Sequence, residues 1–296
     1  MGLLEKVWYF FELFSMSVKS LLRMVVLRSM PQSYPPRTAS TLGILGNGPS
    51  LERDLLQLDR NIPTDLMCVS HFAKTSIFTE LKPNKYIIAD GAFGQQYGTT
   101  SRVGIIVNET VAALIDKVSW PMELYLNIEI CKNKKMIADL KANPFLSIHW
   151  FNATRVEGFA AFSHFFYRMG CGMPPCENVL VAALMVAINQ RYPQVFLMGA
   201  DHSWHEGLII GRNNEMLVND RHFYNPNGKR VDLTNFNGSY RLHDQFFSLA
   251  KTFKSYHQIK AYADEEQVEI VNRSARSFID AFPRETETAT IAHGDH

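Results

Sequence analysis

The 296-residue chain is 46% hydrophobic and 20% charged, and its 30 Lys and Arg residues nearly balance its 29 Asp and Glu residues. This composition excludes a disordered chain, a collagen-like repeat and a disulfide-stabilised miniprotein, and it provides enough apolar residues for a large core. A formal net charge of +1 argues against broad electrostatic binding of nucleic acid, so no nucleic-acid partner is expected.

The N-terminal residues 3–30 contain no Gly or Pro and predict one long apolar helix. Charged residues interrupt the segment every few positions, so no stretch reaches the ~20 apolar residues that a membrane-spanning helix needs. The same interruptions, and the lack of a small-residue cleavage site before Pro31, argue against a signal peptide. The charged positions are Glu5, Lys6, Glu12, Lys19, Arg23 and Arg28.

On a helical wheel these charges leave a wide apolar surface. Glu5, Glu12 and Lys19 recur every seven residues and Arg23 follows, which gathers them into one narrow polar stripe. This pattern is typical of a helix that lies in the interface of an anionic membrane, and packing on the protein body or on a second copy of the chain is the alternative. We therefore expect residues 1–30 to hold a cytoplasmic protein at the inner face of the cell membrane.

The four cysteines are too few and too irregularly spaced for a disulfide framework, and Cys171 and Cys176 lack the second pair of a structural zinc site. Reduced thiols in the cytosol are expected. Pro31, Pro35 and Pro36 predict an extended linker over residues 31–40.

Short apolar runs that alternate with helical or mixed segments predict an α/β domain over residues 41–284. It is Rossmann-like, with a mostly parallel sheet covered by helices on both faces. Residues 202–240 are rich in Asn, Gly, His and Arg, which predicts a lid-like loop region, and residues 285–296 are expected to form a flexible tail. The predicted strands are 41–45, 66–69, 86–89, 104–107, 123–126, 195–198 and 269–271, and the predicted later helices are 178–190, 243–256 and a short one at 274–281.

The turn Gly46-Asn47-Gly48-Pro49-Ser50 follows the first strand and opens a helical pattern. Its glycines let the backbone approach a ligand, and the N–H groups of the following helix with Ser50 favour a phosphate. The turn lacks the third glycine of a dinucleotide fingerprint and the Lys-Ser/Thr ending of a P-loop, so neither an NAD dehydrogenase nor a Walker ATPase is indicated. A purely geometric role for the glycines is the alternative.

Polar side chains follow two other predicted strands. Asp90 ends the strand at 86–89, and the segment Gly199-Ala-Asp201-His202-Ser203-Trp-His205 follows the strand at 195–198. In open α/β sheets ligands bind beyond the carboxyl ends of the strands, so Asp201 could bind a ribose hydroxyl or a metal, or else cap the next turn. The spacing supplies no third metal ligand, and no metal site is expected.

The segment Tyr240-Arg-Leu-His243 opens the last long helix. A histidine at the start of a helix near a phosphate-facing crevice can act as a general base, or it can cap the helix or pack against Phe247.

These motifs and their order resemble bacterial sialyltransferases of glycosyltransferase family 42. That family has a strand-linked Gly-Asn-Gly-Pro-Ser turn, a later Gly-x-Asp and a Tyr-x-x-His segment, which here are Gly46–Ser50, Gly199–Asp201 and Tyr240–His243. The resemblance spans residues 42–282. The chain also looks like the archaeal pterin pyrophosphokinase-like proteins, which contain the same Gly-Pro-Ser-Leu and Gly-x-Asp signatures.

The first resemblance implies that Asn47, Asp90 and Asn178 face a cytidine monophosphate donor. At the position of Asp90 the family has Asn, and at the position of Asn178 it has Ser or Thr. The family places tyrosines on the donor phosphate where this chain has Ser203, Trp204 and His205. The family's base matches His243 best, with His222 second. The expected catalytic residues are His243, His205 and His222, and the expected nucleotide-binding residues are Gly46, Asn47, Gly48, Ser50, Asp90, Asn178, Asp201, His202, Ser203 and Tyr240.

The function expected is that of a metal-independent, sialyltransferase-like glycosyltransferase without a cofactor. It would move a sugar from a nucleotide donor to a glycan or lipid-linked acceptor, and it could form a homo-oligomer. Two rivals stay open: a magnesium-dependent pyrophosphokinase that uses Asp90 and Asp201, and a non-enzymatic, membrane-docked nucleotide-binding protein.

Overall fold

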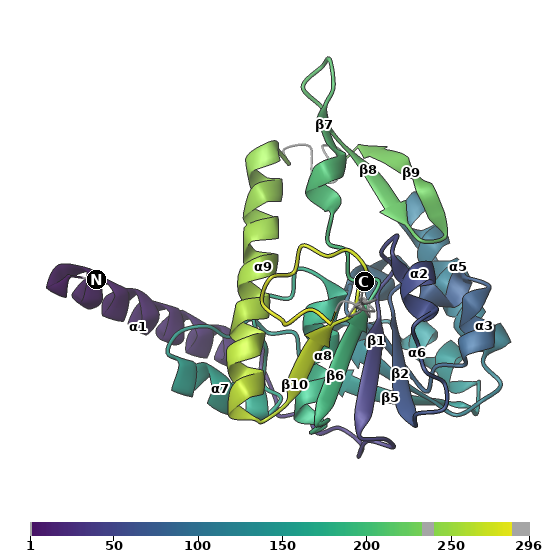
Figure 1. Cartoon of the computed structure of the whole chain (residues 1–296), viewed down its shortest axis with the longest axis horizontal. Helices are drawn as coiled ribbons and strands as arrows, with labels where there is room; N and C mark the ends of the chain where they lie inside the picture. The colour runs from purple at the N-terminus through teal and green to yellow at the C-terminus, as the bar shows by residue number, and fades with distance from the viewer. Residues whose placement is uncertain (1, 233–239, 286–296) are drawn as a thin grey trace, which may run out of the picture.

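The computed structural model describes residues 2–232 and 240–285 and has one central sheet (Figure 1). All seven strands of this sheet are parallel, in the order β10-β6-β1-β2-β3-β4-β5. Their bounds are β1 (Thr41–Leu45), β2 (Thr64–Val69), β3 (Lys85–Ile88), β4 (Met122–Asn127), β5 (Leu146–Phe151), β6 (Gln194–Met198) and β10 (Glu269–Asn272). The predicted α/β class with a parallel sheet is confirmed.

Most strands of this sheet are apolar and buried on both faces, because a layer of helices covers each face. One core cluster joins Leu42 and Ile44 of β1 to α8 (Val179–Asn189) and α9 (Leu242–Glu265). The other joins Leu45 to α5 (Arg102–Lys117) and the neighbouring shorter helices. These shorter elements are α2 (Leu51–Leu55), η1 (Phe72–Lys74), α3 (Ile77–Leu81), α4 (Ala92–Gln96), η2 (Ile128–Lys132) and α6 (Lys134–Lys141).

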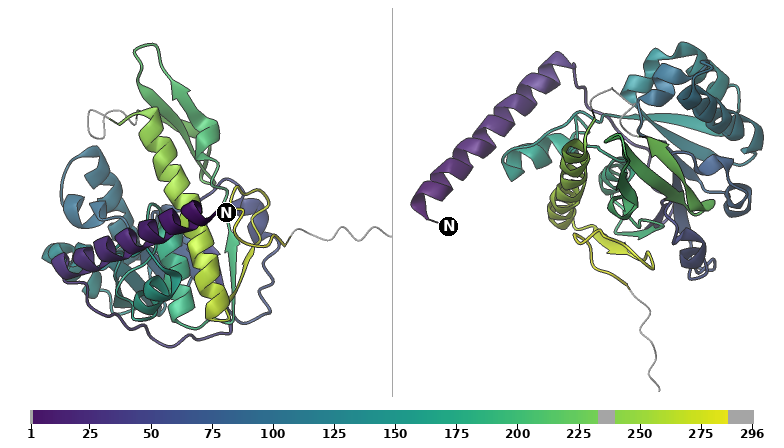
Figure 2. Two further views of the ribbon diagram at one scale, coloured as in Figure 1. Left: turned by 90° about the vertical axis from the view of Figure 1, so that its left-hand side faces the viewer. Right: turned by 90° about the horizontal axis from the view of Figure 1, so that it is seen from above.

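Helix α1 (Leu3–Val26) confirms the predicted N-terminal helix and projects from the body, which Figure 2 shows from two sides. Its second half lies against residues 152–159, just before α7 (Ala160–Arg168). Within the described residues, no helix combines the length and the hydropathy needed to cross a bilayer. The segment from residue 29 to 40 contains no helix or strand, as expected of the predicted linker.

Two sequence predictions of local structure are wrong. Residues 104–107, predicted as a strand, lie in α5, because Ser101 caps the helix by accepting from the Gly104 N–H and because Val107, Val111 and Leu114 bury one helical face. Residues 274–281, predicted as a helix, form a loop that the Ser277 hydroxyl holds by donating to the Ala200 carbonyl at 2.6 Å. Strand β5 was not predicted.

The region 202–240, predicted as a long loop, contains regular structure. After the 3-10 turn η3 (Trp204–Gly207), strands β7 (Leu208–Ile210), β8 (Met216–His222) and β9 (Asn225–Asp232) form an antiparallel sheet in the order β7-β8-β9. We call residues 204–232 the lid. Residues 233–239 of the predicted lid and residues 286–296 of the predicted tail lie outside the described residues.

Candidate functional site

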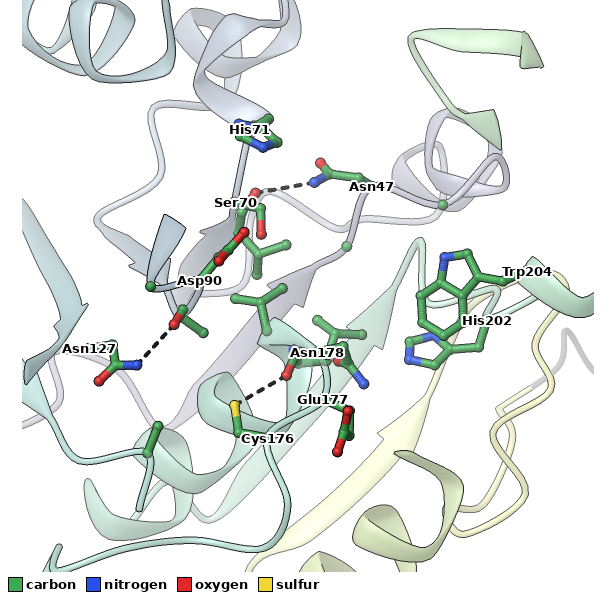
Figure 3. A pocket seen from close by; sticks show the side chains of 18 of the residues that line it. Asn47, Ser70, His71, Asp90, Asn127, Cys176, Glu177, Asn178, His202 and Trp204 are labelled. Atoms are coloured by element: carbon green, nitrogen blue, oxygen red, sulfur yellow. Dashed lines mark hydrogen bonds between the residues drawn. The ribbon is translucent and has the colours of Figure 1, made fainter. Parts of the chain in front are cut away.

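A large pocket lies at the carboxyl edge of the central sheet, where the strand order reverses. From β1 the chain continues through β2 to β5 on one side, whereas β6 and β10 lie on the other, so the loops after β1 and β6 diverge. Such a switch point is where open α/β sheets bind ligands. The pocket there has a volume of about 870 Å³, and residues after six strands and from the lid line it (Figure 3).

The glycine turn after β1 is fastened to the turn after β6. The Gly46 and Gly48 N–H groups donate to the Met198 and Gly199 carbonyls, both at 2.8 Å. A Cβ on Gly48 would stand 2.0 Å from the Asp201 carboxylate, so only glycine fits there. The two turns therefore form one unit at the centre of the pocket.

Asp201 is buried and serves this turn. Its carboxylate accepts from the Ser50 N–H at 3.2 Å and from the Ser50 hydroxyl at 2.9 Å. Burial raises the pKa of Asp201, and the hydrogen bonds from Ser50 oppose that effect. Asp201 thus braces the turn that follows β1 rather than capping the turn that follows Asp201 itself, and it also lines the pocket.

Two amide side chains of the pocket have a buried atom without a partner among the described residues. Asn47 donates its Nδ2 to the Val69 carbonyl at 3.2 Å, while its Oδ1 has no donor. Asn178 caps α8 by accepting from the Leu180 N–H at 2.8 Å, while its Nδ2 has no acceptor. Because buried polar atoms are nearly always hydrogen-bonded, these two amides are the groups in the pocket that most need an additional partner.

His202 is too enclosed to exchange protons with a substrate. It is 6% exposed, its Nε2 lies 2.6 Å from the Tyr256 hydroxyl, and that hydroxyl donates to Asn178 Oδ1 at 3.0 Å. Burial lowers the pKa of His202 to about 3, so the ring is neutral at physiological pH. We assign it a supporting position behind Asn178.

His71, at the end of β2, lines the pocket but was not singled out in the sequence. Its Nδ1 lies 2.8 Å from the Thr110 hydroxyl, which itself donates to the Ile106 carbonyl at 2.8 Å. The imidazole must therefore donate from Nδ1, which leaves the lone pair on Nε2. Burial, and secondly Lys74, lower the pKa of His71 to about 4. This neutral ring stacks on Phe93, with the ring centroids 5.2 Å apart.

The lid closes over the glycine turn and brings His222 into the pocket. The Phe223 N–H donates to the Asn47 carbonyl at 3.2 Å, and the Phe223 ring packs on Phe72 with a centroid distance of 5.4 Å. Next to this anchor, His222 lines the pocket and stacks on Tyr224 at 5.0 Å. His222 also lies near enough to His71 to lower the pKa of that ring.

The pocket brings together most, but not all, of the residues predicted as its site. The predicted residues that line it are Gly46, Asn47, Gly48, Asp90, Asn178, Asp201, His202, Ser203 and His222. Ser50, His205, Tyr240 and His243 are not lining residues: Ser50 lies behind the turn, and His205 packs on Phe278 at 4.4 Å. The hydroxyl of Tyr240 donates to Gln245.

His243 in particular lies away from the pocket lining. Its side chain is 69% exposed, and its Nε2 lies 3.3 Å from Asp244. The start of α9 thus presents this ring to solvent, and its position in this structure gives the predicted base role no support.

Further polar pocket residues that the sequence analysis did not single out also follow strands. Asn127 ends β4 and donates to the Ala89 carbonyl at 3.1 Å, and Asn152 follows β5, the strand that was not predicted. The signal that pointed to Asp90, a polar residue at a strand end, applies to both. Arg28, Lys132 and Arg221 add exposed positive charge to the lining.

The described residues contain no group of three or more His, Cys, Asp or Glu side chains arranged to hold a metal ion. No family model matches this chain. No curated protein matches it either.

One solved structure is similar to it: the crystal structure of the monofunctional alpha-2,3-sialyltransferase Cst-I from Campylobacter jejuni. The identity is 15%, the similarity covers 87% of this chain and 84% of the other, and the TM-score is 0.45. This similarity is distant. At this level of similarity it decides neither the substrate nor the reaction of this chain.

Proposed function

We propose that this chain is a glycosyltransferase that moves a sugar from a nucleotide donor to a glycan or lipid-linked acceptor. The main support is the pocket at the switch point, where the Gly46–Ser50 turn, two unsatisfied amides and a closing lid converge. Its volume of about 870 Å³ is within the usual range for small-molecule sites, which is roughly 300–1,000 Å³.

For the donor we propose a sugar linked to cytidine monophosphate, of the sialic-acid type. The resemblance of the glycine turn to that of the sialyltransferases motivates this choice. Asn47 Oδ1 could accept from the donor and Asn178 Nδ2 could donate to it, so that binding would satisfy one acceptor and one donor that are otherwise buried and unpaired. Arg221 of the lid offers positive charge for the phosphate.

For the reaction we propose direct displacement. His222 takes the proton of the acceptor hydroxyl, the hydroxyl oxygen forms a bond to the anomeric carbon, and the bond from that carbon to the phosphate oxygen breaks. The nucleotide then leaves as a monophosphate whose negative charge the N–H groups and cations of the pocket stabilise, without a resident metal. His222 replaces His243 as the leading base because it lines the pocket.

The pyrophosphokinase rival needs Asp90 and Asp201 to hold magnesium. Asp201 is instead engaged by the N–H and hydroxyl of Ser50, and Asp90 accepts from the Ala92 N–H at 2.8 Å. The contacts from Ser50 occupy the Asp201 carboxylate and so count against its use as a magnesium ligand. The non-enzymatic rival predicts nucleotide binding without turnover.

A thermal-shift series tests the proposed donor, because a ligand that binds only the folded state raises its apparent stability. CMP at saturating concentration should raise the Tm by several degrees with or without magnesium. Asn47→Ala should abolish the shift, and the exposed Asn61→Ala should keep it. A shift that occurs only with ATP and magnesium would replace this proposal with the kinase.

Turnover tests the base. We expect His222→Ala to lower kcat by about 10²–10⁴-fold, the usual contribution of general-base catalysis, and His243→Ala to lower it by less than about threefold. Normal turnover by the His222 variant would exclude His222 as the base. Binding of CMP without transfer to any glycan would favour the non-enzymatic rival.

A further inference from the structure

Helix α1 packs on the body mainly through two serines and Met24, and most of its apolar side chains are left exposed. Ser17 and Ser20 are buried there, together with Met24. The Ser20 hydroxyl donates to the Glu157 carbonyl and accepts from the Glu157 N–H, both at 2.9 Å. Gly158 lies so close to the helix that a Cβ on it would stand 2.0 Å from the Ser17 hydroxyl. These contacts fix the rotation of the helix about its axis.

As a result, a continuous apolar face of α1 points away from the protein. The exposed fractions are 85% for Leu4, 75% for Trp8, 62% for Phe11, 59% for Leu22 and 78% for Val26. On the helical wheel this outward face spans about 140° and contains no charged residue, since Glu5, Glu12 and Lys19 lie along one flank. An exposed apolar surface of this length is unusual on a soluble monomer.

The charges along the helix indicate what covers this face. The half of α1 that meets the body carries Lys19 and Arg23, Arg28 follows at its end, and no acidic residue lies between them. Leu27 and Arg28 also line the pocket. Basic residues beside a wide apolar face, with Trp8 exposed on it, fit an anionic lipid surface. A coiled-coil interface between the α1 helices of two copies of the chain would bury a narrower apolar stripe.

We propose that the outward face of α1 docks into the surface of an anionic bilayer, with the helix parallel to the membrane plane. Because the helix ends at the pocket, docking brings the pocket entrance to the lipid surface. This interaction does not depend on the proposed glycosyl transfer, and it can be measured without any nucleotide.

Flotation of the full-length chain with lipid vesicles tests the proposal. We expect binding to vesicles of one part phosphatidylglycerol and three parts phosphatidylethanolamine, and at least tenfold weaker binding to pure phosphatidylcholine. The double variant Phe11→Gln, Leu22→Gln should bind the anionic vesicles at least tenfold more weakly than the original chain. Both side chains are exposed, so the fold should persist, which circular dichroism checks.

The matched control is Phe246→Gln, Leu56→Gln, which removes one exposed Phe and one exposed Leu elsewhere on the surface. It should float as the unmodified chain does. Equal flotation of the α1 variant and the control would overturn the proposal. So would a stable dimer that does not bind vesicles and that the α1 variant converts to a monomer in light scattering.

Discussion

Two glycines of the pocket differ in what surrounds them. A Cβ on Gly48 would stand 2.0 Å from Asp201 and 2.5 Å from the Gly199 carbonyl, whereas a Cβ on Gly91 would meet only ordinary contacts at 3.6 Å and beyond. We therefore expect Gly48→Ala to lower stability by about 1–3 kcal/mol, as overpacking does, and to weaken nucleotide binding at least tenfold. Gly91→Ala should change neither by much.

Urea unfolding and a nucleotide titration of both variants measure this difference. Equal tolerance at the two positions would mean that the turn after β1 is not held against Asp201 in solution as it is here.

Two histidines with lowered pKa values make stability depend on pH. Their pKa values in the fold, about 4 for His71 and about 3 for His202, lie below the usual 6.5, so the unfolded chain binds more protons than the folded one. Stability is therefore complete above pH 6.5 and falls as the pH drops toward these values. Between pH 7.5 and 5.0, His202 alone should account for a loss of about 2 kcal/mol.

His202→Asn tests this linkage, because Asn tolerates the left-handed backbone of this position, where φ is 54°. The free energy of unfolding, measured in urea at both pH values, should change by about 2 kcal/mol less in the variant than in the original chain. If the variant and the original chain lost the same free energy of unfolding between the two pH values, His202 would not be a neutral buried group.

The attachment of the lid to the glycine turn depends on one buried ring. Phe223 is 5% exposed, and it is the residue whose N–H reaches the Asn47 carbonyl. Phe223→Ala should release β8 and β9 from the glycine turn, since replacement of a buried Phe by Ala costs about 3–5 kcal/mol of packing. Hydrogen exchange should then speed up in the lid, while protection in β1 and β6 persists. Loss of protection across the whole sheet would contradict a separately attached lid.

The attachment of α1 depends on the close approach at Gly158. Gly158→Ala should displace the helix, because the new Cβ would meet the Ser17 hydroxyl at 2.0 Å and the Ser17 backbone N at 2.8 Å. Trypsin should then cleave at Lys19 and Arg23 at least tenfold faster. Gly98→Ala is the control, since Gly98 also has a positive φ, of 85°, but no atoms within 4 Å of an added Cβ. Equal cleavage in both variants would contradict a tight contact.

For the whole molecule, the parallel sheet could be predicted because its strands are continuous apolar runs. Strand β1 and strand β6 carry four buried residues each in sequence. Strand β5 was missed because it lies at the edge and mixes Ser147 and His149 with apolar residues. A run of four apolar residues does not distinguish a buried strand from a helix, which explains the error at 104–107.

The site could be predicted only where a motif marked it. The glycine turn and the polar strand ends were recognisable, but the strand order that brings β1 beside β6 follows from tertiary packing. His71 carries no local signature, and its position depends on contacts with Thr110 and Phe93, which lie 39 and 22 residues further along the chain. The exposed position of His243 also depends on where α9 packs.

The covering of the glycine turn by Phe223 has a kinetic consequence. A nucleotide bound against Asn47 would lie beneath the lid, whereas the second substrate would meet His222 at the lid's own edge. The donor should then bind first, and the spent nucleotide should leave last. In steady-state experiments CMP should be a competitive inhibitor against the donor and a non-competitive one against the acceptor. This inhibition pattern would identify the order in which the substrates bind and the products leave.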